Sequence, residues 1–178
     1  IETPCPKCSG RGRVATPKTI KVSIPAGIDN GQTLAVRGQG NAGVNGGPNG
    51  DINLLVNVRP DPLFERDDFN VWCEIPITFG QAVQGAEIVV PTIDGKVKYE
   101  IHEGTQPGTV FRLKGKGIPF LNGHGRGDQY VKVMIEVPKK LSKEQKELME
   151  RFDRSLNDKN YEKRKGFFQR LEEMFSGS

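Results

Sequence analysis

The sequence predicts a mainly β protein with two β-sandwich-like domains in tandem, followed by C-terminal α-helices. Three observations support this prediction. A glycine-punctuated segment occurs twice, short runs of alternating apolar and polar residues surround both copies, and after Pro138 the spacing of the apolar residues changes from strand-like to helix-like. With 22 glycines, 12 prolines and 35% hydrophobic residues among 178, the chain suits short strands, many turns and thin cores.

The repeat is clearest in its glycines, five of which recur 77 positions later: Gly27, Gly31, Gly38, Gly40 and Gly50 match Gly104, Gly108, Gly115, Gly117 and Gly127. Five matches in one register indicate two versions of one β-rich unit. Residues 38–43 also have the G-x-G-x-x-G spacing of a dinucleotide-binding loop. We reject that interpretation because Pro48 and its neighbours cannot start the required helix, and we interpret these glycines as turn residues with positive φ.

Charge, the length of the apolar runs and the number of cysteines each argue against certain partners or settings. The net charge of +4 is spread among alternating acidic and basic residues, which argues against a dedicated nucleic-acid face. No apolar run approaches the roughly 20 residues of a membrane span, and we expect no signal peptide. Three cysteines, an odd number, favour a reducing, intracellular setting.

The first residues contain a C-x-x-C pair, Cys5 and Cys8, followed by Gly10 and Gly12. Two thiolates at this spacing can form one edge of a zinc tetrahedron, so we predict half a structural zinc site. The alternative is a redox pair, although the surrounding sequence lacks the βαβ pattern of a thioredoxin-like protein. The third cysteine, Cys73, lies far along the chain in a strand-like run.

Alternation predicts three strands in the first copy, over Thr19–Ile24, Thr33–Arg37 and Asp51–Val58. A proline-stiffened joint, residues 59–68, follows them. Its isolated apolar pair, Leu63 and Phe64, either fills a neighbouring core or lines a groove for a ligand.

The second copy has more elements before its glycines. We expect a strand at Val71–Pro76, one or two helical turns from Thr78, and a β-hairpin from Glu87 to His102, with a final strand at Gln129–Val137. The first copy lacks counterparts of these leading elements, so its domain is predicted to be incomplete. The expected divisions are 1–16 (cysteine-rich remnant), 17–65 (first β domain), 66–139 (second β domain) and 140–178 (helical segment).

The C-terminal segment predicts two amphipathic helices. Ser142 and Gln145 form a capping-box pattern, after which Leu148, Phe152 and Leu156 share one helix face. A second helix is expected over Lys165–Phe175. Such apolar faces at the end of a chain, after two β units, favour contact with another copy of the chain.

Several motifs resemble the zinc-containing (type I) DnaJ co-chaperones: C-P-K-C-S-G-R-G, I-P-A-G-I-D-N-G-Q, F-E-R-D-D, V-P-T-I-D-G, K-G-K-G-I-P and G-D-Q-Y-V-K-V. The resemblance covers nearly the whole chain. It implies the C-terminal substrate-binding region, without the J domain and most of the zinc module, in which Cys5 and Cys8 form the last cysteine module. It places Ile20, Val22 and Phe64 at a client-peptide pocket, while Ile20 could equally be ordinary core.

The resemblance further implies a non-enzymatic, cytoplasmic protein of protein folding and the stress response. Such a protein binds unfolded polypeptide, delivers it to a DnaK-type ATPase, binds zinc in its full-length form, and has no nucleic-acid or membrane partner. It forms a homodimer through its C-terminal segment, here Leu156, Phe167, Phe168, Leu171 and Phe175. The alternatives from the residues themselves are a zinc-ribbon nucleic-acid binder and a C-x-x-C thiol oxidoreductase.

Overall fold

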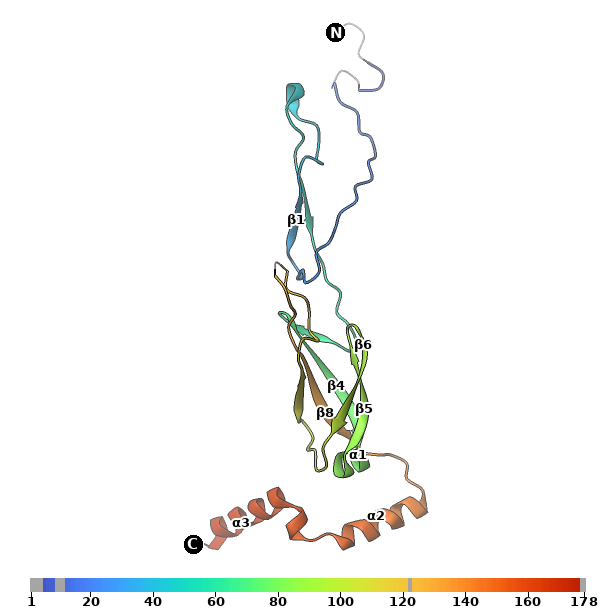
Figure 1. Ribbon diagram of the computed structural model, residues 1–178, viewed down its shortest axis with the longest axis vertical. Coiled ribbons are helices and arrows are strands. Elements are labelled where there is room, and N and C mark those ends of the chain that lie inside the picture. Colours follow the sequence, from blue (N-terminus) through green and yellow to red (C-terminus); the bar gives the residue numbers. More distant parts are fainter. Residues whose placement is uncertain (1–4, 9–11, 122, 177–178) are drawn as a thin grey trace. The chain divides into compact units, whose positions relative to one another are not determined.

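The computed structural model describes residues 5–8, 12–121 and 123–176 (Figure 1). The chain divides into two compact units, residues 1–135 and residues 136–178, and each is described by itself. The first consists mainly of strands and the second mainly of helices, which confirms the predicted class of a mainly β protein with C-terminal helices. In the part of the chain that the structure describes, every helix is too short or too polar to span a lipid bilayer.

The first copy of the repeat folds as a two-stranded antiparallel ribbon. Strand β1 (Thr33–Val36) pairs with β2 (Ile52–Leu55), and the loop between them contains one turn of 3₁₀ helix, η1 (Val44–Gly46). The predicted strand at Thr19–Ile24 is wrong, because residues 13–25 have no regular secondary structure. A strand needs a neighbour for its backbone hydrogen bonds, and the described chain supplies none for this segment.

The second β region, residues 64–136, contains two layers. A four-stranded sheet has the order β3 (Glu65–Asp67), β4 (Asn70–Thr78), β8 (Gln129–Glu136) and β7 (Val110–Leu113). A separate hairpin joins β5 (Ala86–Thr92) to β6 (Gly95–Ile101). This confirms the predicted hairpin, whose two-residue turn is 93–94.

A short helix, α1 (Phe79–Gln84), connects the two layers, as expected from the residues after Thr78. The hydroxyl of Thr78 accepts a hydrogen bond from the backbone of Gln81, and the Gln81 side chain accepts one from the backbone of Thr78. This capping box satisfies donors that would otherwise lack partners at the start of the helix. Gly85 ends it with a φ of 77°.

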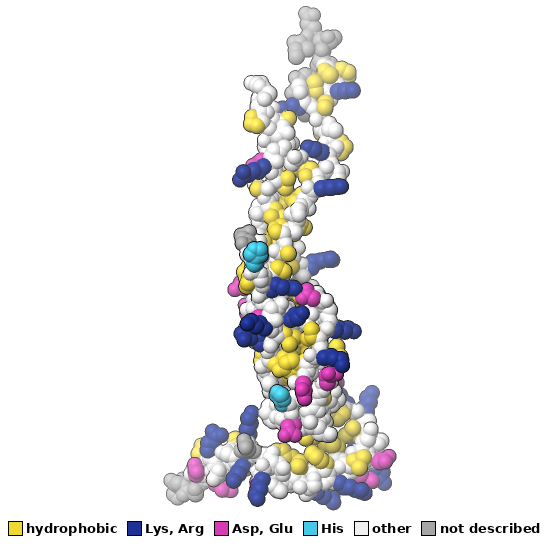
Figure 2. All heavy atoms as spheres, in the orientation of Figure 1, with side chains coloured by type: hydrophobic (Ala, Val, Ile, Leu, Met, Phe, Trp, Pro, Cys, Tyr) yellow, Lys and Arg dark blue, Asp and Glu magenta, His cyan; other side chains and the backbone are white. Residues whose placement is uncertain are grey.

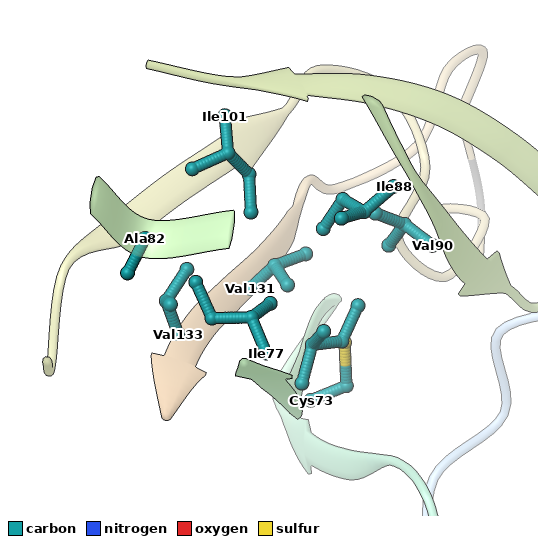
Figure 3. Close-up of a cluster of buried hydrophobic side chains, with 9 residues drawn as sticks. Cys73, Ile77, Ala82, Ile88, Val90, Ile101, Val131 and Val133 are labelled. Carbon is teal, nitrogen blue, oxygen red and sulfur yellow. The ribbon is translucent and has the colours of Figure 1, made fainter. Parts of the chain in front are cut away.

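Apolar side chains from both layers meet in one core (Figure 3). The sheet contributes alternate residues of β4 and β8, and the hairpin and α1 cover them. Val90, Val131 and Val133 are completely buried. Burying a side chain of this size stabilises the fold by about 1.5–3 kcal/mol, so this cluster anchors the whole second β region. The members are Cys73, Ile75, Ile77, Ala82, Ile88, Val90, Ile101, Val131 and Val133.

The backbone hydrogen bonds of the two copies repeat in the same register. Thr33 lies opposite Leu55 in the first copy, and Val110 lies opposite Lys132 in the second, 77 positions later in each case. Two further pairs of backbone hydrogen bonds have the same offset. Gly31 N donates to Val56 O and Gly108 N donates to Val133 O, both at 2.8 Å. Gly40 N donates to Gly50 O at 2.7 Å, and Gly117 N donates to Gly127 O at 2.8 Å. The predicted repeat is therefore confirmed in three dimensions.

The repeated glycines serve two different purposes. Gly38 and Gly115 have positive φ, as expected. Gly40 and Gly117 do not; they are needed because a Cβ would lie 2.8 and 2.5 Å from the carbonyl carbons of Gly50 and Gly127. Only a residue without a side chain allows the two backbone segments to approach so closely. A phosphate-binding role is excluded, since three residues of 3₁₀ helix follow Gly43 rather than an α-helix.

The terminal unit consists of α2 (Lys143–Ser155), a 3₁₀ turn η2 (Asp158–Asn160) and α3 (Glu162–Ser176). The predicted capping box at Ser142 and Gln145 is confirmed, with both reciprocal hydrogen bonds present. No side chain that the structure describes in α2 or α3 is buried. The apolar stripes of both helices therefore remain exposed within this unit.

Candidate functional site

The joint between the two copies presents an apolar pair on a rigid turn. The carboxylate Oδ1 of Asp61 accepts hydrogen bonds from the backbone N–H groups of Leu63 (2.8 Å) and Phe64 (3.2 Å). Pro60 and Pro62 on either side of Asp61 fix their own φ angles. As a result Leu63 is 62% exposed, whereas Phe64 is half-buried and packs against the core of the second β region.

Phe64 lines two neighbouring hollows. The first, of about 460 Å³, lies beside β4 and is bordered by Leu63, Trp72 and the Glu74–Lys132 ion pair, whose atoms are 2.8 Å apart. The second, of about 560 Å³, has an apolar floor formed by Val58, Pro60, Phe64, Val71, Ile93 and Ile118. Phe64 therefore packs against the core and also lines both hollows, and Leu63 lines the first; that either hollow binds a ligand stays a prediction.

An open strand edge begins at the first hollow. Strand β3 pairs with only three residues of β4, and its last pair is Glu65 with Trp72. From Cys73 to Thr78, β4 continues with β8 on its other side and with no strand on the β3 side in the described part of the chain. Unpaired backbone N–H and C=O groups along such an edge can bind another extended chain.

The outer face of the same sheet carries an aromatic pair that the sequence analysis did not identify. The rings of Trp72 on β4 and Tyr130 on β8 stack with centroids 4.8 Å apart and planes 20° apart. Glu74 and Lys132 follow each ring two residues later and pair across the same strands. The alternation of residues along each strand indicates that each ring shares a face with the charged residue two positions later. The sequence does not indicate that β4 and β8 are neighbours, so it could not predict that the two rings stack.

Arg66 holds the first copy against the joint. Its guanidinium donates to the carbonyl oxygens of Ile28 (2.7 Å), Gly27 (3.0 Å) and Asp68 (2.7 Å), and its Nε lies 3.4 Å from Asp29 Oδ1. These contacts place the turn at residues 27–29 beside the second hollow, whose lining includes Asp29.

The structure does not bring all predicted peptide-binding residues together. Ile20 and Val22 lie half-buried in the segment without regular structure, and neither lines the two hollows beside Phe64. Their predicted positions on a strand required the pairing partner that the described first copy lacks. Val58, Ile93 and Ile118 contribute to the apolar floor instead, and no sequence motif marked them for this role.

Cys5 and Cys8 lie at a turn, with Cys5 exposed and Cys8 half-buried. Hydrogen bonds from the backbone of Lys7 and of Cys8 lower the pKa of the Cys5 thiol below its ordinary value, and one with the Cys8 side chain adds to this. Such a preference for the thiolate suits a zinc ligand. Gly10, the first of the two glycines that follow the pair, lies outside the described residues.

The described residues contain no cluster of three or more possible metal ligands. Cys73 cannot complete the pair, because it lies in the core and accepts a hydrogen bond from Gln129 Nε2 at 3.2 Å. Burial raises the pKa of the Cys73 thiol. The available metal ligands are therefore the thiols of Cys5 and Cys8, and two thiols fit one edge of a tetrahedral zinc site.

The residues predicted for a dimer contact lie on the terminal helices. Leu156 is the half-buried C-cap residue of α2. Phe167, Phe168, Leu171 and Phe175 are exposed on α3, and the Phe167 and Phe168 rings meet edge to face, with centroids 5.5 Å apart. On the face seen in Figure 2, hydrophobic side chains lie exposed along these helices between groups of both charges.

Comparison with known proteins gives two family matches. The DnaJ C terminal domain matches residues 7–138, and the Chaperone protein DnaJ C-terminal region matches residues 144–177. Among curated relatives, the Chaperone protein DnaJ of Acetivibrio thermocellus is 57% identical over 97% of this chain and 45% of its own length. The Chaperone protein DnaJ of Ruminiclostridium cellulolyticum is 59% identical over 96% of this chain and 49% of its own length. The Chaperone protein DnaJ of Clostridioides difficile is 56% identical over 89% of this chain and 41% of its own length.

The chain thus spans somewhat less than half the length of the curated relatives it matches. The two matches meet near the boundary between the β-rich and helical units, so strands and helices alike belong to the matched region. Together these matches show that the chain belongs to the DnaJ C-terminal domain family.

Proposed function

We propose that this chain binds non-native polypeptide as part of a DnaJ-type co-chaperone and performs no catalysis of its own. The observation that carries this proposal is the exposed Leu63 beside half-buried Phe64, placed between two hollows at the start of an unpaired strand edge. An extended client segment would add to β4 beyond Trp72 and insert an apolar side chain next to Phe64. Backbone pairing tolerates many sequences, whereas the hollow selects for an apolar side chain.

The expected affinity is modest. Each backbone hydrogen bond contributes about 0.5–1.5 kcal/mol net, and burial of one Leu-sized side chain contributes about 1.5–3 kcal/mol. Ordering the client costs part of this sum. Weak, reversible binding is what a protein needs if it passes clients onward, and in the whole protein we propose that the recipient is a DnaK-type ATPase. We further propose that the protein acts in the cytoplasm and in the response to protein-unfolding stress.

The cysteine pair has a supporting role in this proposal. Cys5 and Cys8 would hold one edge of a structural zinc ion, with the other two ligands supplied by residues beyond these two. The lowered pKa of Cys5 supports this role, because zinc binds the thiolate form. Zinc would supply cross-linking of the chain here rather than chemistry.

Dimerisation would double the number of binding sites. The exposed apolar faces of α2 and α3, including Phe167, Phe168 and Leu171, support a contact between two copies of the chain. Two joined copies can hold one client at two places, which raises the overall affinity without any new contact within a site.

The test is suppression of aggregation when a chemically unfolded enzyme is diluted into buffer with this chain. Replacing Leu63 by Ser should reduce suppression without unfolding the protein, since Leu63 is 62% exposed. Val89→Ser is the matched control, because Val89 on β5 is 57% exposed and lies outside both hollows. Equal activity of both variants and the wild type would contradict this placement of the site.

A further inference from the structure

We propose that Asn45 is a site of spontaneous deamidation, at which the backbone nitrogen of Gly46 converts the side-chain amide into aspartate or isoaspartate. The sequence contains four Asn-Gly pairs, which begin at Asn30, Asn45, Asn49 and Asn122. Asn122 lies outside the described residues, and the other three have different surroundings. This inference does not rest on the proposed function, because Asn45 lines neither hollow.

The reaction needs only the chain and water. A base in the solvent removes the proton from the Gly46 backbone N–H, and this nitrogen attacks Cγ of Asn45. The bond from Cγ to Nδ2 breaks and ammonia leaves, so a succinimide ring forms. Water then opens the ring at either carbonyl, which gives aspartate or isoaspartate and adds a negative charge. Glycine favours the attack, because it has no Cβ to hinder the approach of its nitrogen.

The groups that react at Asn45 are held only by local contacts. Asn45 is exposed, and its side chain forms no hydrogen bond within the described part of the chain. Gly46 ends η1, a single 3₁₀ turn held by short-range bonds such as that from Gly47 N to Val44 O, 3.0 Å. Hydrogen bonds in such turns have poor geometry, so this turn can open without movement elsewhere in the fold. A Cβ at Gly46 would have nothing within 4 Å, so the attack also has room.

Asn30 is also exposed, but both groups that would react there are held by another segment. Gly31 N–H donates to the carbonyl oxygen of Val56 at 2.8 Å. The side-chain Oδ1 of Asn30 accepts a hydrogen bond from the backbone N–H of Val58 at 2.9 Å. Attack at Asn30 therefore requires this turn to separate from the chain that follows β2.

Asn49 is held in a similar way but less firmly. Gly50 N–H donates to the carbonyl oxygen of Asn41 at 2.9 Å, and Asn49 Nδ2 donates to Gly38 O at the longer distance of 3.3 Å. Each hydrogen bond that must open lowers the rate about twofold to tenfold. Asn45 should therefore react fastest of the three, Asn49 more slowly and Asn30 most slowly.

The experiment follows deamidation of the whole folded chain during prolonged incubation in mildly alkaline buffer. Mass spectrometry of tryptic peptides detects the replacement of the side-chain amide nitrogen by oxygen. Asn45 and Asn49 lie in the same tryptic peptide, residues 38–66, because Pro60 prevents cleavage after Arg59. Fragmentation of that peptide compares the two sites directly. We expect Asn45 to convert about tenfold faster than Asn49 or Asn30.

Urea provides the matched control, since the three pairs contain the same reacting groups. In urea-unfolded chain the hydrogen bonds at Asn30 and Asn49 are lost, so the three rates should converge. A rate at Asn45 no higher than the other two in the folded chain would overturn the proposal. A preference for Asn45 that is equally large in urea would also overturn it, because the local sequence rather than the fold would then set the rate.

Discussion

Asp51 and Asp128 accept the same hydrogen bond in the two copies of the repeat. Oδ1 of each carboxylate accepts from the backbone N–H of the glycine thirteen residues earlier, Gly38 in the first copy and Gly115 in the second, and both distances are 2.7 Å. Each bond closes the glycine loop that precedes the last strand of its copy. The two carboxylates are therefore structural, although an aspartate next to a glycine-rich loop also occurs in catalytic and phosphate-binding sites.

Replacing Asp128 by Ala should destabilise the second β region by about 1–3 kcal/mol, because the Gly115 N–H loses a charged acceptor. Asp128→Asn should cost less, since its amide oxygen can still accept the bond. Urea unfolding followed by circular dichroism measures the difference. Asp51→Ala is expected to have a smaller effect, because Asp51 is exposed and water can replace its oxygen. Identical losses for the Ala and Asn variants would mean that this hydrogen bond contributes little.

Substitutions of Gly27 and Gly31 can test how much the contact between the two copies of the repeat contributes to stability. Both have positive φ, 88° and 78°. A Cβ at Gly27 would collide with the carbonyl oxygen of Pro119, whereas a Cβ at Gly31 would have nothing within 4 Å. Gly31→Ala should cost about 1–2 kcal/mol from backbone strain alone, and Gly27→Ala clearly more. Equal shifts of the urea midpoint would show that the approach of Pro119 to Gly27 is not essential.

The sequence predicted local features and the repeat better than it predicted strand pairing and the lining of the second hollow. The repeat, the α1 position and the Ser142 cap depend on residues close in sequence or on a constant offset, and all are confirmed. The strand expected around Ile20 and Val22 was wrong because a strand depends on a partner that alternation alone cannot supply. The groove floor escaped prediction because Val58, Ile93 and Ile118 come from separate loops that only the fold brings together.

The cysteines should differ sharply in reactivity. In metal-free protein, Cys5 should react with iodoacetamide at lower pH than an ordinary thiol, because its lowered pKa keeps more thiolate at a given pH. Cys73 should remain unmodified until the protein unfolds, since it is buried and its pKa is raised. Mass spectrometry of each cysteine peptide across a pH series measures both. Similar rates for Cys5 and Cys73 in the folded protein would contradict these environments.

Labelling of the thiols also distinguishes a zinc-ligand role of Cys5 and Cys8 from a redox role. A zinc ligand should be protected when zinc is added to a protein that contains the remaining ligands, whereas a redox pair should form a disulfide with mild oxidant and exchange it with thiols. Loss of a disulfide-reductase activity in Cys5→Ser would favour the oxidoreductase alternative. Absence of any such activity in the wild type would remove that alternative.

The terminal helices should be coupled to association. An isolated helix of the length of α3, 15 residues, is marginal in water, and no described side chain in it is buried within its own unit. Its stability is therefore expected to come from burial of Phe168 and Phe175 against a second copy. Phe168→Glu together with Phe175→Glu should weaken a dimer by more than tenfold and lower the helical signal in circular dichroism, because a charge replaces an apolar contact.

Val137→Glu is the control for this change, since Val137 is 73% exposed, close to the 77% of Phe175, but precedes both helices. Sedimentation velocity at tens of micromolar should show a dimer for the wild type and for Val137→Glu, and a monomer for the double variant. A wild-type chain that sediments as a monomer of 19.7 kDa at this concentration would contradict dimerisation at useful affinity. A dimer that persists in the double variant would instead move the contact away from α3, toward the stripe on α2 that contains Leu148 and Phe152.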